Sequence, residues 1–175
     1  MEKILNKIRF AILTVSDRSA RGEREDVSGP ALRKAVEEYG GEVVQYKVVA
    51  DEQKAIEKIL KDWCDTDRMD VILTTGGTGC APRDVTPEAT AAVIERPVPG
   101  IAEAIRSASL KITSHAMLSR GIAGIRKRVL VINLPGSPKG AVQSFEIALP
   151  VLPHAVQLLR EDSAAEQSHN SQNLR

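Results

Sequence analysis

The sequence predicts an α/β protein, a three-layer α/β/α sandwich built on a mostly parallel sheet. Segments patterned like strands and segments patterned like helices alternate along the chain. Residues 71–75 and 128–134 are rich in apolar and β-branched side chains, as expected for parallel strands that helices cover on both faces. Polar or glycine-rich motifs follow the strands at their C-terminal ends, and open parallel sheets bind ligands at that edge.

The first half of the chain is expected to contain two strand-and-helix units. Apolar runs predict the strands, and apolar residues spaced three and four apart predict the helices. Ser28 is the expected N-cap of the first helix, with Pro30 in its first turn, and Gly40 is expected to end it. The loop of mixed charge before this helix is longer than most such connections. The expected elements are strand 10–15, loop 19–26, helix 28–39, strand 43–49 and helix 55–63.

The second half continues the alternation. Thr86 is the expected N-cap of the helix after the third strand, with Pro87 at its first position, and Ser137 and Pro138 repeat this pattern. Residues 116–121 are either a strand edge or a loop. The expected elements are strand 71–75, helix 86–96, helix 101–110, strand 128–134, a helix start at 137–138 and helix 152–160; residues 1–160 form one domain and residues 161–175 a polar tail expected to be disordered.

Composition excludes several functional classes. In 175 residues, 42% hydrophobic and 27% charged content indicates one soluble globular domain. A net charge of +1 and five scattered aromatic residues argue against a nucleic-acid partner. No signal-peptide core begins the sequence and no apolar run approaches the roughly 18 residues of a membrane span, so we expect a cytoplasmic protein without membrane contact. Cys64 and Cys80 lack the spacing of a zinc site or disulfide framework; Cys64 is expected in the core.

A glycine-rich turn after the third strand predicts an anion site. Gly76, Gly77 and Gly79 let the backbone turn its N–H groups outward, and the helix expected at Thr86 adds its positive end. Such a nest of amides suits phosphate. The turn is neither a Walker A loop nor a dinucleotide fingerprint, because the lysine of the first is missing and Pro82 replaces the third glycine of the second.

Two aspartates are expected at the same sheet edge. A carboxylate such as Asp84 beside a phosphate cradle would repel the ligand unless a cation lies between them, and Mg²⁺ is the usual cation there. Asp51 leaves the second strand and could share the ion. The alternatives are that Asp84 caps a turn and that Asp51 caps the next helix. The glycine turn and the helix start expected at Ser137 could each hold a phosphate group. Two phosphate groups bridged by magnesium indicate phosphoryl or nucleotidyl transfer.

Four ordered motifs resemble the molybdopterin adenylyltransferases, the MogA/MoaB family of molybdenum cofactor biosynthesis. They are residues 74–79, 82–88, 119–120 and 133–139, and the resemblance extends from about residue 9 to residue 159. It implies a three-layer α/β fold and a homotrimer, or a hexamer in one branch. It also implies the reaction: the terminal phosphate of molybdopterin attacks the α-phosphate of Mg²⁺-bound ATP, giving adenylated molybdopterin and pyrophosphate. The product would pass to a molybdenum insertase.

The resemblance also implies roles for individual residues. Asp51 and Asp84 match the two essential acidic positions, which are the expected catalytic residues and metal ligands. Because the nucleophile is already an anion, no general base is needed; cations and oriented amides lower a barrier that comes from joining two polyanions. The positions expected to bind ATP or molybdopterin are Ser16, Asp17, Gly76, Gly77, Thr78, Gly79, Arg83, Ser119, Arg120, Pro135, Gly136, Ser137, Pro138 and Lys139.

Several alternatives stay open at this stage. A related protein could bind molybdopterin without adenylylating it, although both aspartates argue against this. A flavodoxin-like flavin carrier also has a phosphate loop after a parallel strand, but the strand exits here carry no aromatic residues to enclose a flavin. Cys80 departs from the larger apolar residue or proline that the family pattern suggests, and it could be a reactive thiol. Lys139 could be no more than a solvated charge at a helix start.

Overall fold

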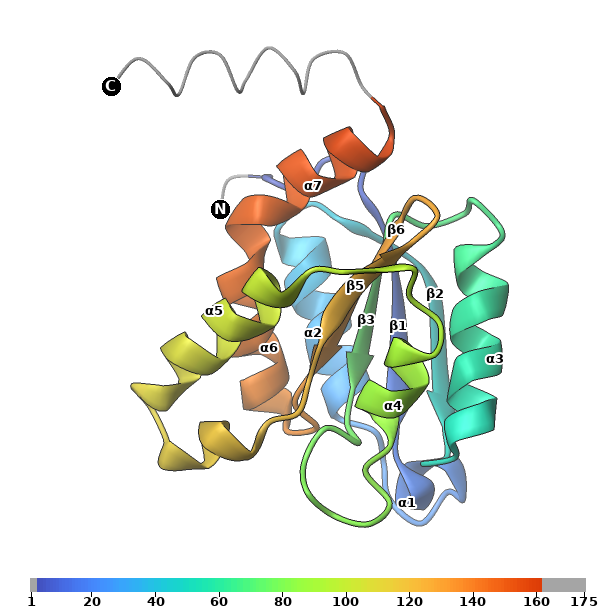
Figure 1. The fold of residues 1–175 in the computed structure, drawn as a ribbon, viewed down its shortest axis with the longest axis vertical. Coiled ribbons are helices and arrows are strands. Elements are labelled where there is room, and N and C mark those ends of the chain that lie inside the picture. Colours follow the sequence, from blue (N-terminus) through green and yellow to red (C-terminus); the bar gives the residue numbers. More distant parts are fainter. Residues whose placement is uncertain (1–2, 162–175) are drawn as a thin grey trace.

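A computed structural model describes residues 3–161 and contains a six-stranded sheet with the order β2-β1-β3-β6-β5-β4 (Figure 1). The first four strands in this order run parallel to one another, and β5 and β4 are antiparallel to their neighbours. The sheet is therefore mostly parallel, as predicted. The strands are β1 Arg9–Val15, β2 Glu42–Val49, β3 Val71–Thr75, β4 Arg96–Pro97, β5 Ala123–Arg126 and β6 Val129–Leu134.

Helices cover both faces of the sheet, which confirms the three layers. The helices α2, α5, α6 and α7 pack on one face, and α3 and α4 pack on the other (Figure 1). The parallel topology requires this arrangement, because each strand must cross over to the next through a helix that packs on the sheet. The helices are α1 Asp17–Ala20, α2 Ser28–Glu38, α3 Gln53–Cys64, α4 Thr86–Ala91, α5 Pro99–Leu110, α6 Pro138–Ala148 and α7 Leu152–Leu159, with 3-10 turns η1 Ser114–Leu118 and η2 Leu149–Val151.

Alternation along the central strands builds two separate cores. In β1, Phe10 and Ile12 belong to the core under α2 and α6, whereas Ala11 and Leu13 belong to the core under α3 and α4. Successive side chains of a strand point to opposite faces, so one buried strand serves both layers. Phe10 also packs edge-to-face on Phe145 of α6, with ring centroids 6.2 Å apart. Cys64 lies in the second core with 2% of its surface exposed, as predicted.

The structure corrects several predicted elements. The helix after the glycine turn was expected to reach residue 96, but α4 ends at Ala91, and β4 follows before Pro99 begins α5. The strand β5 and the short helix α1 were not predicted. Residues 116–121, expected to be a strand edge or a loop, contain the end of η1 and then a loop. The two missed strands are two and four residues long, too short to show an apolar period.

Two predicted helix caps are also wrong. Val27 precedes α2 and Val85 precedes α4, and the side chain of neither valine caps its helix. The first two amides of α2 donate to the carboxylate of Asp26 instead. Ser28 and Thr86 instead lie inside their helices, where their hydroxyls donate hydrogen bonds to the carbonyls of loops that reach the sheet edge. The third prediction is confirmed: Ser137 Oγ accepts a hydrogen bond from Gly140 N at 3.2 Å and caps α6.

None of the helices within residues 3–161 is long and apolar enough to cross a membrane. The predicted tail falls almost entirely outside the described residues, since only its first residue, Glu161, is part of them.

Candidate functional site

Two pockets meet at the carboxyl edge of the parallel strands. The smaller pocket, of about 270 Å³, lies at the ends of β1, β2 and β3, and the larger one, of about 460 Å³, lies between the glycine turn, α5 and α6. Gly77, Asp84 and Gly136 line both pockets. The sheet edge that the sequence predicted as the site therefore holds two adjoining spaces with a shared wall.

The glycine turn after β3 is folded as the sequence predicted, with left-handed backbone at Gly76 (φ +103°) and Gly77 (φ +63°). A Cβ at Gly76 would lie 2.2 Å from the carbonyl oxygen of Val15, so no other residue fits between this turn and β1. Thr86 secures the turn from the other side, because its hydroxyl donates to Gly76 O at 2.9 Å and its amide to Gly77 O at 3.0 Å. The turn is thus fixed at the wall that the two pockets share.

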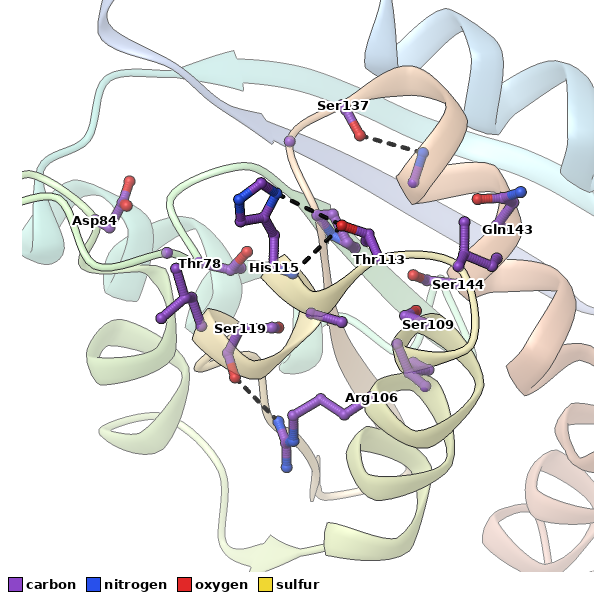
Figure 2. A pocket seen from close by; sticks show the side chains of 18 of the residues that line it. Thr78, Asp84, Arg106, Ser109, Thr113, His115, Ser119, Ser137, Gln143 and Ser144 are labelled. Atoms are coloured by element: carbon purple, nitrogen blue, oxygen red, sulfur yellow. Dashed lines mark hydrogen bonds between the residues drawn. The ribbon is translucent and has the colours of Figure 1, made fainter.

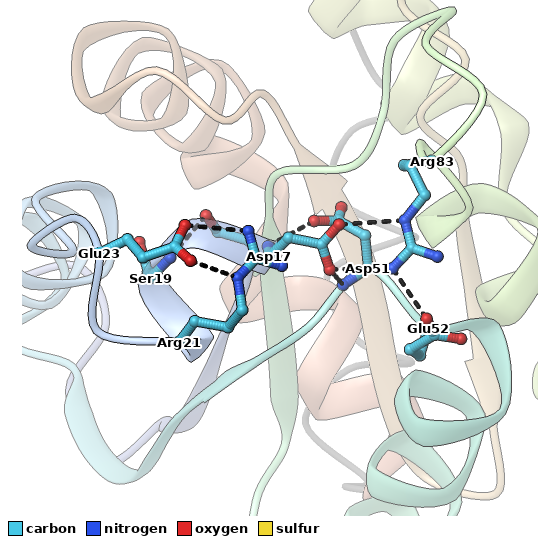
Figure 3. A network of polar contacts seen from close by, with 8 residues as sticks. Asp17, Ser19, Arg21, Glu23, Asp51, Glu52 and Arg83 are labelled. Atoms are coloured by element: carbon cyan, nitrogen blue, oxygen red, sulfur yellow. Dashed lines mark hydrogen bonds and ion pairs between the residues drawn. The ribbon is translucent and has the colours of Figure 1, made fainter.

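Asp17 and Asp51 are joined by reciprocal hydrogen bonds (Figure 3). The amide of Asp17 donates to Asp51 Oδ2 at 2.7 Å, and the amide of Asp51 donates to Asp17 Oδ1 at 3.1 Å. Burial raises the pKa of Asp51, and the charges of Asp17 and Asp84 raise it further. Asp51 therefore does not cap α3, the alternative that its position allowed; it lies half-buried in the smaller pocket.

Asp84 faces the junction of the two pockets. Its Oδ2 accepts a hydrogen bond from the amide of Ala81 at 3.0 Å, which leaves Oδ1 without a partner among the described hydrogen bonds. The negative charge of Asp84 raises the pKa of Asp51, so the two carboxylates interact electrostatically across the smaller pocket. No group of three or more His, Cys, Asp or Glu side chains that could enclose a metal occurs within residues 3–161. Two carboxylates nevertheless fit Mg²⁺, which usually takes one or two from the protein and the remaining ligands from phosphate and water.

The guanidinium of Arg83 forms ion pairs with two carboxylates, those of Asp17 and Glu52 (Figure 3). It forms two bonds to Asp17, from Nε at 3.0 Å and from Nη2 at 2.9 Å, and Nη2 also contacts Glu52 at 2.8 Å. This ion pair lowers the pKa of Asp17, chiefly through the hydrogen bonds from Arg83. Arg83 was predicted to bind substrate; here it lies at the site but lines neither pocket. The pairing with Asp17 was not predicted.

Arg120 holds the segment that follows the glycine turn. Its Nε donates to Gly79 O at 2.6 Å and its Nη2 to Asp84 O at 2.5 Å, and its guanidinium forms an ion pair with Glu88. The backbone amide of Arg120 donates to Thr78 O at 2.9 Å. Arg120 was also predicted to bind substrate, and the structure instead brings its guanidinium against backbone carbonyls of the loop.

Of the remaining residues predicted to bind substrate, some line a pocket and others do not. Ser16 caps α1 through a 3.3 Å hydrogen bond from Ser19 N and lines the smaller pocket. Pro138 and Lys139 are at the start of α6 and line neither pocket. The predicted residues that do line the larger pocket are Gly77, Thr78, Gly79, Asp84, Ser119, Pro135, Gly136 and Ser137.

Sequence reasoning missed the far wall of the larger pocket. Figure 2 shows this wall, which α5 and α6 build together with η1. The Arg106 guanidinium donates to the carbonyl of Gly121 at 2.8 Å and so ties α5 to the loop before β5. A polar stripe on α5 was the only available signal, and it resembles an ordinary solvated face. The missed polar residues are Arg106, Ser109, Thr113, His115, Gln143 and Ser144.

The sequence matches, over residues 11–154, a protein family described as "Probable molybdopterin binding domain". This chain belongs to that family. The molybdopterin adenylyltransferase of Helicobacter pylori strain J99 is 43% identical to it over 157 residues, which are 89% of each protein. That of Escherichia coli strain K12 is 39% identical over 148 residues, covering 81% of this chain and 74% of the relative. The molybdopterin biosynthesis enzyme MoaB of Thermus thermophilus is 52% identical and has a TM-score of 0.81, covering 87% of this chain and 96% of that one.

Membership of the molybdopterin-binding family confirms the resemblance that the four motifs predicted. Each of those motifs contributes residues to the junction of the two pockets or to the contacts that hold it. The fold that the resemblance implied is confirmed as well, since the solved relatives share the mixed α/β architecture.

Proposed function

We propose that this chain transfers an adenylyl group from Mg²⁺-bound ATP to the terminal phosphate of molybdopterin. An oxygen of the molybdopterin phosphate attacks the α-phosphorus of ATP, the bond from that phosphorus to the β-phosphate bridging oxygen breaks, and pyrophosphate leaves. The products are adenylated molybdopterin and pyrophosphate. The relatives named molybdopterin adenylyltransferase, at 43% and 39% identity over most of this chain, support this assignment.

One observation carries the proposal, namely that two pockets adjoin at Gly77, Asp84 and Gly136. A protein that only bound molybdopterin would need one pocket, whereas joining two substrates requires two spaces with a shared wall. The left-handed Gly77, Gly136 and the carboxylate of Asp84 form this wall, so backbone amides and a bound cation would both face the point where the two phosphates meet.

The residues at the junction suit a reaction between two anions. The molybdopterin phosphate is already ionised, so the site needs no general base. Asp51 and Asp84 would hold Mg²⁺ together with oxygens of the triphosphate, and the ion would neutralise charge that develops on the leaving pyrophosphate. The amides of the glycine turn and the capped start of α6 would orient the phosphates. Arg83 and Arg120 would keep the two loops in place through their contacts with Asp17 and Gly79.

The oligomeric state, the cellular location and the fate of the product are proposed from the family resemblance. The resemblance stated from the sequence implies a homotrimer or hexamer, a cytoplasmic location and transfer of the product to a molybdenum insertase. Large apolar side chains exposed beside the larger pocket, at Ile112, Met117 and Leu118, would suit contact with another protein chain.

The test is incubation of the purified protein with ATP, Mg²⁺ and molybdopterin, with the adenylated product sought by mass spectrometry and pyrophosphate measured in parallel. We expect both products in equal amounts, and neither when EDTA is in excess or when molybdopterin is omitted. Molybdopterin binding without pyrophosphate release would identify a binding protein instead. A yellow purified protein would point to a flavin carrier.

A further inference from the structure

Every carbonyl oxygen of residues 76–79, in the glycine turn, accepts a hydrogen bond from one of two residues. The hydroxyl and the amide of Thr86 donate to the first two carbonyls, at 2.9 and 3.0 Å. The amide and the Nε of Arg120 donate to the last two, at 2.9 and 2.6 Å. Thr86 in α4 and Arg120 after η1 therefore fix four consecutive peptide groups of the turn.

The four amides of the same peptide groups have no acceptor. These are the N–H groups of residues 77–80, here called the amide nest, and no group within residues 3–161 accepts a hydrogen bond from them. The amides on either side are bound, because Gly76 N donates to Leu134 O at 3.3 Å and Ala81 N donates to Asp84 Oδ2 at 3.0 Å. The amide nest is therefore one continuous set with a bound amide at each end.

Peptide geometry gives the amide nest its direction. The part of the chain that the structure describes has no cis peptide bond, and the C=O and N–H of a trans peptide group point to opposite sides. Each amide of the nest therefore points away from the residue that binds the carbonyl of its peptide group. Those residues, Thr86 and Arg120, line neither pocket, whereas Gly77, Thr78 and Gly79 line the larger one. The amide side of the turn is thus the side toward the pockets.

Four amides without acceptors suit an oxyanion. Thr78 is 7% exposed, and a largely buried N–H without an acceptor is destabilising unless a ligand or water completes it. Successive amides that point to one side of a turn bind phosphate well. The nest ends beside Asp84, whose carboxylate binds the next amide and would repel phosphate unless the expected Mg²⁺ lies between them. A phosphate in the nest would therefore lie next to the cation.

We propose that Thr86 and Arg120 are positioning residues, which hold the carbonyls of the turn so that the amide nest binds a phosphate group. The inference rests on the proposed reaction only for the source of that phosphate, either the triphosphate of ATP or the terminal phosphate of molybdopterin. Arg120, predicted to bind substrate, acts through the loop instead. Thr86, predicted only as a helix cap, becomes part of the support of the site.

Arg120→Met tests the inference, because methionine keeps an unbranched side chain and removes the donors to Gly79 O and Asp84 O. Glu88→Gln is the matched control, since it weakens the ion pair of Arg120 and leaves those donors in place. We would measure the dissociation constants of Mg²⁺-ATP and of molybdopterin by calorimetry. One of the two should bind Arg120→Met about tenfold more weakly, the size of one hydrogen bond, and the other should bind normally. Both should bind Glu88→Gln as they bind wild type.

Two substitutions of Thr86 provide an independent test. Thr86→Val keeps the shape of the side chain but cannot donate to Gly76 O, whereas Thr86→Ser keeps the hydroxyl. We expect the valine variant to lose affinity for the same substrate as Arg120→Met, and the serine variant to bind both substrates normally. Thr86 is fully buried, so melting temperatures are measured alongside; if Thr86→Val does not fold, the comparison of Arg120→Met with Glu88→Gln decides.

Amide NMR reports on the nest directly. In isotope-labelled wild type with Mg²⁺, inorganic phosphate should shift the amide resonances of residues 77–80, and sodium chloride at the same ionic strength should not. The shifts should shrink in Arg120→Met. Unshifted resonances in wild type would overturn the inference, as would equal losses of affinity for both substrates in Arg120→Met, which indicate a general structural role. If phosphate shifts these resonances but no adenylated product forms, the amide nest stands and the proposed reaction fails.

Discussion

Asp17 and Asp51 each donate a backbone amide to the carboxylate of the other, at 2.7 and 3.1 Å, and so lock the exits of β1 and β2 together. Such a pair would bring two negative charges close, and Arg83 compensates by binding Asp17 through two nitrogens. The result is a chain of contacts from the glycine loop through Asp17 to Asp51. The bonds to Asp17 are charge-assisted, but the Arg83 side chain is 55% exposed, so solvent limits what this ion pair contributes to stability.

Replacing Arg83 tests this chain of contacts. Arg83→Gln should leave Asp17 uncompensated beside Asp51 and lower kcat/KM by about tenfold, with a small change in melting temperature because exposed ion pairs contribute about 1 kcal/mol or less. Glu52→Gln is the matched control, since it removes the other partner of Arg83 and leaves the Asp17 pair in place. Steady-state kinetics at saturating Mg²⁺ would compare the two. Equal losses in both variants would contradict a role through Asp17.

Asp84→Asn separates catalysis from structure. The amide can still accept the hydrogen bond from Ala81 N, but it loses the charge that would anchor Mg²⁺. We expect a folded protein that binds molybdopterin normally and turns over about a hundredfold more slowly, which corresponds to roughly 3 kcal/mol of transition-state stabilisation. Single-turnover assays and thermal unfolding would be measured on the same preparation. Normal turnover with a lowered melting temperature would make Asp84 a structural cap.

The stability of Asp51→Asn should depend on pH. Because folding raises the pKa of Asp51, the ionised carboxylate opposes folding at pH values above its folded pKa. When the pH falls below the ordinary value of 3.8, both states are protonated and this effect vanishes. In EDTA, the variant should therefore melt above wild type at pH 7, and the difference should shrink as the pH falls toward 3.8. A difference that stays constant with pH would indicate altered packing instead.

Two glycine substitutions should shift stability in opposite directions. Gly76→Ala places a Cβ 2.2 Å from Val15 O in left-handed backbone, and it should lower the free energy of unfolding by roughly 2–4 kcal/mol. Gly100→Ala lies in α5 with nothing within 4 Å of the added atom, and it should raise that free energy by about 0.5–1 kcal/mol. Denaturant titration measures both. A tolerated Gly76→Ala would mean that the turn is not held as described.

The two thiols should differ in reactivity. Cys80 is exposed, whereas Cys64 is buried, and its burial raises the pKa of the thiol to about 12. A thiol-specific reagent at pH 8 should therefore label one cysteine per native chain within minutes and the second only after unfolding. Cys80→Ala should abolish the fast reaction and Cys64→Ala should leave it unchanged. Prompt labelling of both thiols in the native protein would show that the second core opens.

Much of the fold could be predicted because its signals are local. The central strands are short runs of apolar and β-branched residues, and amphipathic spacing marks the helices between them. The pair β4 and β5 could not be predicted, because β4 has two residues, one of them Pro97, and the pairing of β5 depends on β6. The predicted helix caps at Ser28 and Thr86 were wrong for a similar reason. Their hydroxyls donate to carbonyls of loops that only the folded chain brings near.

The sequence by itself determined the family, the layer architecture and the edge of the sheet at which the candidate site lies. A strand end and a glycine turn are each fixed by a few neighbouring residues, and parallel topology gathers the strand ends on one side. Only the tertiary structure decided which side chains meet there. Arg83 and Asp17 are 66 residues apart, and Arg120 lies 41 residues from the Gly79 carbonyl that it binds. Such contacts depend on how separate loops pack together, which leaves no periodic pattern in the chain.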